Sequence, residues 1–253
     1  MNGTWRILCY HEVDDAQVPA FRAQLHALLH RGWQPCSLDE GLAADGAVRG
    51  ARFSVTFDDG DHSVRAAAKL AADEFSIHCG IYVTTDYVER GLRYRDAAPR
   101  LALTWDDLRR LAQQGHTIGG HGHTHADMPR CGDGELRAEL ERAGALIRLR
   151  LGLSTEHVSY PWGQYDARTI RFVQTWGGLR SAATIDRGVN RPLDPWQLNR
   201  DLVDPGWSVG RFTLALALGR LPWLYRRQRS LRALAARLGS TPGRARRPTG
   251  DHA

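Results

Sequence analysis

Residues 54–60 read Ser-Val-Thr-Phe-Asp-Asp-Gly and place two adjacent carboxylates, Asp58 and Asp59, directly after a short apolar run. The run, residues 53–57, predicts a buried strand, and the glycine that follows predicts a turn. Neighbouring carboxylates repel each other, so the pair is explained if one binds a cation and the other stays free as a base. The structural alternative is an Asp-Asp-Gly turn that only closes a strand.

A second polar cluster favours the cation. Residues 118–125 read Ile-Gly-Gly-His-Gly-His-Thr-His, so His121 and His125 stand four positions apart and glycines allow a close approach. Two imidazoles and one distant carboxylate can form a three-ligand site that keeps open positions for water. A histidine pair alone is more often an ordinary hydrogen-bonding pair. Its combination with Asp58 and Asp59 is much harder to explain structurally.

Short apolar segments alternate with helical patterns along the chain. Strands are predicted over residues 6–11, 52–57, 77–84, 116–120, 157–160, 181–185 and 197–203, and helices over 19–31, 62–75, 104–114, 133–151 and 166–176. Residues 86–102 show weak periodicity and predict a loop beside the site. Alternating strands and helices form parallel sheets, either a (β/α) barrel or an open doubly wound sheet. No glycine-rich phosphate loop follows the first strand, which disfavours a nucleotide-binding sheet.

Composition and charge narrow the class of protein. The 253 residues are 42% hydrophobic and 25% charged, as in an ordinary folded domain. Residues 220–253 hold nine arginines and one acid, so the net charge of +6 divides into +8 there and −2 elsewhere. The body therefore has no nucleic-acid-binding composition. Four scattered cysteines, no signal peptide and no apolar run of membrane-spanning length favour a cytoplasmic protein.

The two polar clusters together resemble the motifs of the polysaccharide deacetylase family, the NodB-homology enzymes of carbohydrate esterase family 4. Residues 56–60, Thr-Phe-Asp-Asp-Gly, are similar to its first motif, and residues 121–125 to its HxxxH motif. The resemblance spans residues 5–204. It implies an α/β fold, a distorted (β/α) barrel of about seven parallel strands with a C-terminal helical extension.

The resemblance also implies a metal site. Asp59, His121 and His125 would bind a divalent cation, most often zinc in this family. His123, between the two histidine ligands, would lie outside the ligand set or on the substrate side, and its replacing one ligand is the alternative.

Further roles follow from the same resemblance. Asp58 would be the general base, and a backbone N–H, that of Trp162, would polarise the attacked carbonyl. The third motif, in a variant form, comprises Tyr160, Pro161, Trp162 and Gly163.

Two positions depart from the family pattern. The arginine that usually orients the base is replaced by Ser159, and Arg200 is the candidate substitute; a surface arginine is its alternative. The late histidine that often serves as the acid is missing. Residues 8–13, Leu-Cys-Tyr-His-Glu-Val, resemble a permuted branch that includes poly-N-acetylglucosamine deacetylases, so His11 becomes the predicted acid. A histidine that merely ends a strand is the alternative.

The C-terminal region has a different character. We predict a catalytic domain over 1–206, basic amphipathic helices over 207–240 and a disordered tail over 241–253. Leucines and arginines here suit an anionic membrane surface, so peripheral contact with the inner membrane is one interpretation. A helix that packs its leucines on the barrel is the other.

These observations predict a metal-dependent hydrolase that removes N-acetyl groups from the amino sugars of a polysaccharide, oligosaccharide or glycolipid precursor, with no nucleic-acid partner. An O-acetyl ester hydrolase could use the same site. A non-catalytic carbohydrate-binding or membrane-associated module is the alternative from another class; the loss of the motif arginine favours it, and the intact aspartates and histidines oppose it.

Overall fold

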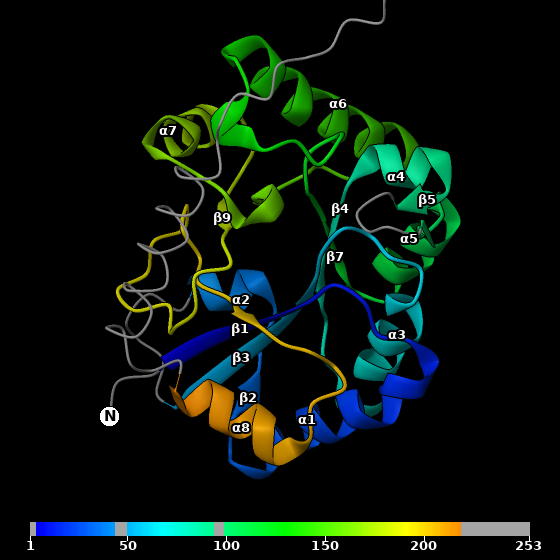
Figure 1. Ribbon diagram of the computed structural model, residues 1–253, viewed down its shortest axis with the longest axis vertical. Helices are drawn as coiled ribbons and strands as arrows, with labels where there is room; N and C mark the ends of the chain where they lie inside the picture. Colours follow the sequence, from blue (N-terminus) through cyan, green and yellow to red (C-terminus); the bar gives the residue numbers. More distant parts are fainter. Residues whose placement is uncertain (1–3, 44–49, 94–98, 219–253) are drawn as a thin grey trace, which may run out of the picture. The chain divides into compact units, whose positions relative to one another are not determined.

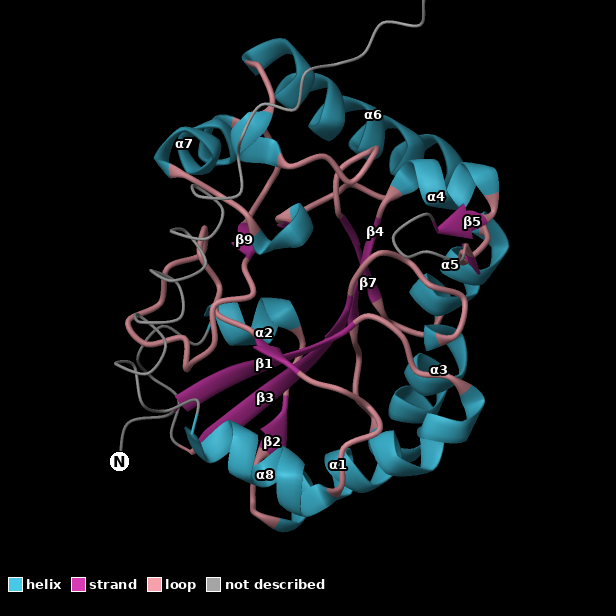
Figure 2. Ribbon diagram, viewed as in Figure 1, coloured by secondary structure: helices cyan, strands magenta, loops and turns pink. Residues whose placement is uncertain are grey.

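The computed structural model describes residues 4–43, 50–93 and 99–218, all of which belong to the unit Met1–Arg220. A curled parallel sheet forms its centre (Figure 1, Figure 2). The hydrogen-bonded order is β10-β1-β3-β4-β7-β8-β9, with β2 added beside β3. The strands are β1 (Thr4–Tyr10), β2 (Gln34–Pro35), β3 (Ala51–Phe57), β4 (Gly80–Val83), β7 (Thr117–Gly120), β8 (His157–Ser159), β9 (Ser181–Ala183) and β10 (Asp201–Leu202).

The segment 195–203 links the two ends of the sheet. Its backbone hydrogen-bonds to Ala182 of β9 and to Thr184 just after it, and Leu198 forms a parallel bridge to Ala183. A few residues later β10 pairs in parallel with β1. The sheet therefore curls into a ring, and the predicted distorted barrel of about seven parallel strands is confirmed.

Helices cover the outside of this ring, as Figure 1 shows. They are α1 (Val18–His30), α3 (Val64–Phe75), α5 (Trp105–Gln113), α6 (Asp133–Leu151), α7 (Ala167–Thr175) and α8 (Val209–Leu218). Local sequence signals set their ends: Thr104 and Asp107 form a capping box at the start of α5, and Asp166 caps α7. Apolar side chains on both faces of the sheet are buried, which explains why the strand sequences are nearly continuous apolar runs.

Short elements complete the unit. These are α2 (Leu38–Ala43), α4 (Thr85–Arg90), the antiparallel pair β5 (Leu92–Arg93) and β6 (Arg100–Leu101), and the single turns η1 (Asp15–Gln17), η2 (Met128–Arg130) and η3 (Pro161–Gly163). The predicted loop over 86–102 was therefore wrong in part. A six-residue helix is too short to show a period, and α4 is stabilised by burying Tyr87 and Val88.

The C-terminal prediction is only partly within the described residues. Helix α8 packs against α1 through the buried side chains of Phe212 and Leu216, while Leu214 and Leu218 are exposed. The remaining predicted helices up to residue 240, and the tail over 241–253, lie outside the described residues. Among the described residues, no helix is both long enough and apolar enough to cross a bilayer.

Candidate active site

Three of the predicted ligands meet at the carboxyl ends of the strands. Asp59 lies two residues after β3, His121 directly follows β7, and His125 lies in the loop between β7 and η2. Oδ1 of Asp59 lies 3.4 Å from Nε2 of His121 and 3.2 Å from Nε2 of His125, and the two nitrogens are 3.2 Å apart. All three side chains are buried. We call Asp59, His121 and His125 the ligand triad.

The spacing of the ligand triad fits a small divalent cation. Zinc bonds of about 2.0–2.1 Å at tetrahedral angles place neighbouring ligand atoms about 3.3–3.4 Å apart. The three measured separations lie close to that edge length. Two imidazole nitrogens and one carboxylate oxygen are also ligands that zinc prefers.

Outer contacts fix the orientation of two ligands. Nδ1 of His121 lies 2.9 Å from the carbonyl oxygen and 2.6 Å from the hydroxyl oxygen of Ser159, which leaves Nε2 pointing at the triad. Oδ2 of Asp59 accepts a hydrogen bond of 2.9 Å from the buried Arg93. Each contact leaves the metal-binding atom of its ligand, Nε2 of His121 or Oδ1 of Asp59, facing the centre of the triad. Ser159 thus supports a ligand from the position where the family motif has its arginine.

The backbone is strained where it carries this site. Among the described residues, the non-glycine residues with positive φ, between +54° and +69°, are Asp59, His125, Trp162 and Ser76. The first two belong to the triad, and the third packs on His125. Such conformations persist only where the surroundings impose them, and they concentrate at functional sites. Glu139 of α6 is one such constraint, because its carboxylate accepts hydrogen bonds from the backbone N–H groups of His123 and Thr124.

The second aspartate, Asp58, is held by Arg200. The two side chains form paired hydrogen bonds of 2.6 Å, and both are buried. Arg200 also donates to the carbonyl oxygen of Thr184 at 2.7 Å. Its interpretation as a surface arginine is therefore wrong.

The charges around Asp58 keep it ionised. Burial raises the pKa of this carboxyl, but Arg200 and His121 outweigh burial and lower the pKa to about 2. Oδ2 of Asp58 lies 4.0 Å from Nε2 of His121. An ionised carboxylate that is not part of the triad therefore lies beside it, as a general base requires.

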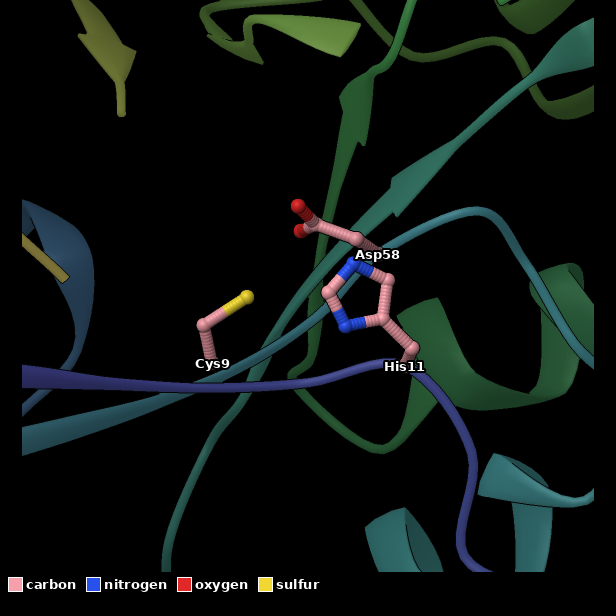
Figure 3. A group of neighbouring side chains, drawn as sticks. All are labelled: Cys9, His11 and Asp58. Atoms are coloured by element: carbon pink, nitrogen blue, oxygen red, sulfur yellow. The ribbon is translucent and has the colours of Figure 1, made fainter. Parts of the chain in front are cut away.

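His11 lies on the same side of the barrel as Asp58. Asp58 follows β3 beside the end of β1, and its N–H donates to the carbonyl oxygen of Tyr10 at 2.9 Å. One ring nitrogen of the half-buried His11 lies within 4.8 Å of an Asp58 oxygen. In Figure 3 the imidazole lies beside the Asp58 side chain. The structure thus brings the predicted acid and the predicted base together.

The four residues of the variant third motif do different things. Tyr160 is fully buried and donates from its hydroxyl to the carbonyl oxygen of Trp196, so its side chain serves the core. Pro161 is also buried. Trp162 is 44% exposed and donates from Nε1 to the carbonyl oxygen of His125 at 3.0 Å, and its ring packs on the His125 ring.

Gly163 is required by packing. Its φ is +62°, and a Cβ there would lie 2.1 Å from Cγ1 of Ile185. This glycine lets the turn η3 approach Ile185, just after β9, and η3 places Trp162 beside the ligand triad.

His123 lies between the two histidine ligands in sequence but not in the ligand triad. Its Nδ1 is 2.9 Å from the hydroxyl oxygen of Thr85 at the start of α4. The ring is half-buried and contacts that helix. His123 therefore lies outside the ligand set, as we predict.

Comparison with known proteins identifies the family of this chain. The family model described as polysaccharide deacetylase matches residues 45–179, which is more than half of the chain. The chain belongs to the polysaccharide deacetylase family. The predicted NodB-homology relationship is confirmed.

Individual deacetylases are similar over most of this chain. YxkH of Bacillus subtilis (strain 168), which is named as a polysaccharide deacetylase, is 22% identical over 214 residues, covering 81% of this chain and 74% of YxkH. The structure of IcaB from Ammonifex degensii is 24% identical, covers 84% of this chain and 97% of IcaB, and gives a TM-score of 0.70. The Streptococcus pyogenes deacetylase PplD is 18% identical, covers 85% of this chain and 99% of PplD, and also gives 0.70. These structures share the fold.

Two charged residues of this candidate site were not predicted from the sequence. Arg93 came from the segment predicted as a loop, and no local pattern separates it from the other arginines there. Glu139 did carry a signal, because it shares a helix face with the buried Leu136, Leu140 and Ala143. An acid on the apolar face of a helix needs a buried partner, and here the partner is the loop between the two histidine ligands.

Proposed function

We propose that this polysaccharide deacetylase family member is a metal-dependent N-deacetylase of amino sugars. The observation that carries the proposal is the pairing of two differently held aspartates. Asp59 lies with two histidines at the spacing of cation ligands, while the adjacent Asp58 is ionised, held by Arg200 and outside that group. This division between a ligand and a base is what hydrolysis by an activated water requires.

The ligand triad would hold the cation. A divalent ion bound there supplies Lewis acidity, which lowers the pKa of a coordinated water and polarises an acyl carbonyl. Ser159 and Arg93 keep the donor atoms turned toward the ion. Zinc is the ion we propose, because the donor set and spacing suit it.

Two residues of the chain move protons. An oxygen of Asp58 takes a proton from the attacking water while the oxygen of the water bonds to the acetyl carbon. When the carbon–nitrogen bond breaks, the nitrogen leaves with a proton that His11 donates from its ring. The products are acetate and a free amine. Arg200 keeps Asp58 ionised and fixes the plane of its carboxylate.

The proposed class of substrate follows from the aromatic ring that lies beside the ligand triad. The half-exposed Trp162 ring beside His125 offers a face on which a sugar ring can stack. PplD has been crystallised with acetate, which is the acid that this reaction would release. We therefore propose an N-acetylated saccharide, free or attached to a lipid.

Acetate release tests the proposal. Protein freed of metal and then supplied with zinc is incubated with N-acetylglucosamine oligomers and, separately, with acetylated xylan. We expect zinc-dependent release from the amide substrates and a loss of about 10²–10⁴-fold in Asp58→Asn, which removes the base but keeps the size of the side chain.

Other outcomes would change the assignment. Release from xylan alone would make the protein an O-acetyl esterase that uses the same residues. Zinc binding with no release from any acetylated saccharide would instead support a carbohydrate-binding module.

A further inference from the structure

A third donor lies beside the catalytic pair. Sγ of Cys9, a ring nitrogen of His11 and an oxygen of Asp58 all lie within 4.8 Å of one another. Figure 3 shows the thiol, the imidazole and the carboxylate directed toward one shared space. Cys9 and Asp58 are buried and His11 is half-buried. We call these residues the thiol cluster.

Strand geometry explains why they meet. Cys9 and His11 are two residues apart, so an extended chain directs both side chains to the same face, the interior of the barrel. The parallel register pairs Cys9 with Thr56 and Tyr10 with Phe57, which places Asp58 beside His11. The cluster is thus built by two neighbouring strands and their ends.

We propose that the thiol cluster is a second cation site, selective for soft divalent ions such as Zn²⁺ and Cd²⁺. One thiolate, one imidazole and one carboxylate form a mixed sulfur, nitrogen and oxygen donor set that suits these ions and not Mg²⁺ or Ca²⁺. On binding, the S–H proton of Cys9 is released to solvent and a sulfur–metal bond replaces it. The positive charge of Arg200, which acts on Cys9, favours the thiolate.

The second ion binds more weakly than the first. In the ligand triad, Oδ1 of Asp59 faces both imidazoles at 3.2–3.4 Å, whereas both oxygens of Asp58 in the thiol cluster already accept hydrogen bonds of 2.6 Å from Arg200. Burial also raises the pKa of the Cys9 thiol, so only an ion that bonds strongly to sulfur displaces the proton. The ligand triad therefore fills first, and the thiol cluster fills in excess metal.

Occupation of the thiol cluster inhibits the enzyme. The second ion takes Asp58 and His11, which are the base and the acid of the proposed deacetylation. Excess zinc is therefore an inhibitor of an enzyme that zinc activates. The inhibition rests on the proposed function, but the binding of the second ion does not.

Cadmium binding tests the site without relying on activity. The metal-free protein is titrated with Cd²⁺, with bound metal measured by equilibrium dialysis and the thiolate-to-cadmium charge-transfer absorption recorded in the ultraviolet. We expect this absorption to appear only after the first equivalent of cadmium is bound. In Cys9→Ser it is lost and the stoichiometry falls by one ion per chain.

The matched control is Cys36→Ser. Cys36 is also buried in the barrel, but in the described part of the chain it belongs to no group of metal donors. This variant should keep both the absorption and the stoichiometry. Circular dichroism verifies folding, and Cys9→Ala replaces Cys9→Ser if the serine variant unfolds.

The outcomes separate the two claims. No thiolate absorption in the wild type, or its persistence without Cys9, would overturn the second site whether or not the protein deacetylates a saccharide. If the site is present, the zinc concentration that halves acetate release should rise at least tenfold in Cys9→Ser. An unchanged inhibitory concentration would overturn the inhibitory role.

Discussion

The ligand triad can be compared with a second carboxylate and imidazole group at the opposite, amino ends of the strands. That amino-end cluster consists of Asp39, Glu156 and His157, whose donor atoms also lie within 4.8 Å of one another. Nε2 of His157 lies 3.3 Å from Oδ1 of Asp39, a distance similar to those in the ligand triad. Residue types and single distances therefore do not distinguish the two groups.

The difference lies in burial and in the nearest cation. The side chains of Asp39 and Glu156 are 47% and 45% exposed, and Arg180 pairs with both carboxylates. In the ligand triad all three groups are buried, and the guanidinium of Arg93 contacts the oxygen of Asp59 that points away from the histidines. At the amino-end cluster Arg180 neutralises both acids, whereas Arg93 orients Asp59 without contacting the oxygen that faces the histidines.

The strongest test of this comparison replaces one carboxylate in each group. Asp59→Asn should abolish tight zinc binding and reduce acetate release to background, because a neutral amide replaces the only anionic ligand of the triad. Asp39→Asn should keep both properties. Zinc is measured by elemental analysis after dialysis against a weak chelator. Equal zinc loss in the two variants would mean that the amino-end cluster also holds metal.

The two arginines provide the next test. Arg200→Met leaves Asp58 buried without its partner and should lower the free energy of unfolding by about 3–5 kcal/mol. Arg180→Met removes a half-exposed pair and should cost about 0–1 kcal/mol. Denaturant unfolding measures both changes in the free energy of unfolding. The comparison requires the same slope of free energy against denaturant concentration for all variants. Similar values for the two would contradict the assignment of Asp58 as a buried charge that depends on Arg200.

A smaller effect is expected from the arginine behind the triad. Arg93→Gln removes the charged donor to Oδ2 of Asp59 but can still form one hydrogen bond. Zinc affinity, measured by competition with a chromophoric chelator, should fall about 10–100-fold, as for other residues that orient metal ligands. Arg109→Gln, at an exposed pair with Asp106, is the control and should leave the affinity unchanged. An unaltered affinity in Arg93→Gln would show that the contact does not position the ligand.

A buried histidine outside both clusters should show the smallest effect. Burial lowers the pKa of His116 to about 4, and its Nδ1 accepts a hydrogen bond from the N–H of Cys79. The unfolded chain, with an ordinary pKa of about 6.5, binds the proton more readily, so stability falls as the pH drops from about 6.5 toward 4.

Between pH 7 and pH 5, His116 should lower the free energy of unfolding by about 1–2 kcal/mol. In His116→Asn, whose amide oxygen can accept the same hydrogen bond, that part of the pH dependence should be missing. Urea unfolding at the two pH values measures it. An identical pH dependence in the variant would mean that His116 is not buried in its neutral form.

Much of the fold could be predicted because its signals are local. Capping residues and apolar periods gave α5, α6 and α7 within one or two residues of their observed ends. Helix α4 and strand β2 could not be predicted, because a six-residue helix and a two-residue strand carry no periodicity and depend on tertiary contacts. Closure of the barrel depends on the segment 195–203, where we predict a strand over 197–203 but only Asp201–Leu202 forms one, β10.

The site was predictable to the extent that its residues belong to motifs. Asp58, Asp59, His121 and His125 stand in two short patterns, and the structure brings their side chains together. Arg200 was a candidate for orienting the base only through the family resemblance, and Arg93 was missed, because both reach the aspartates from distant segments. The amino-end cluster adds the converse lesson, since acids and a histidine also gather where an arginine neutralises them.

Titration of the metal-free protein with zinc tests the central claim most directly. Acetate release from an N-acetylglucosamine oligomer is followed as zinc is added in known amounts. We expect activity to rise to a maximum at one equivalent of zinc per chain, with Asp59→Asn inactive throughout. Full acetate release by the wild type in the presence of a strong chelator would contradict the account, because the paired aspartates would then work without a cation.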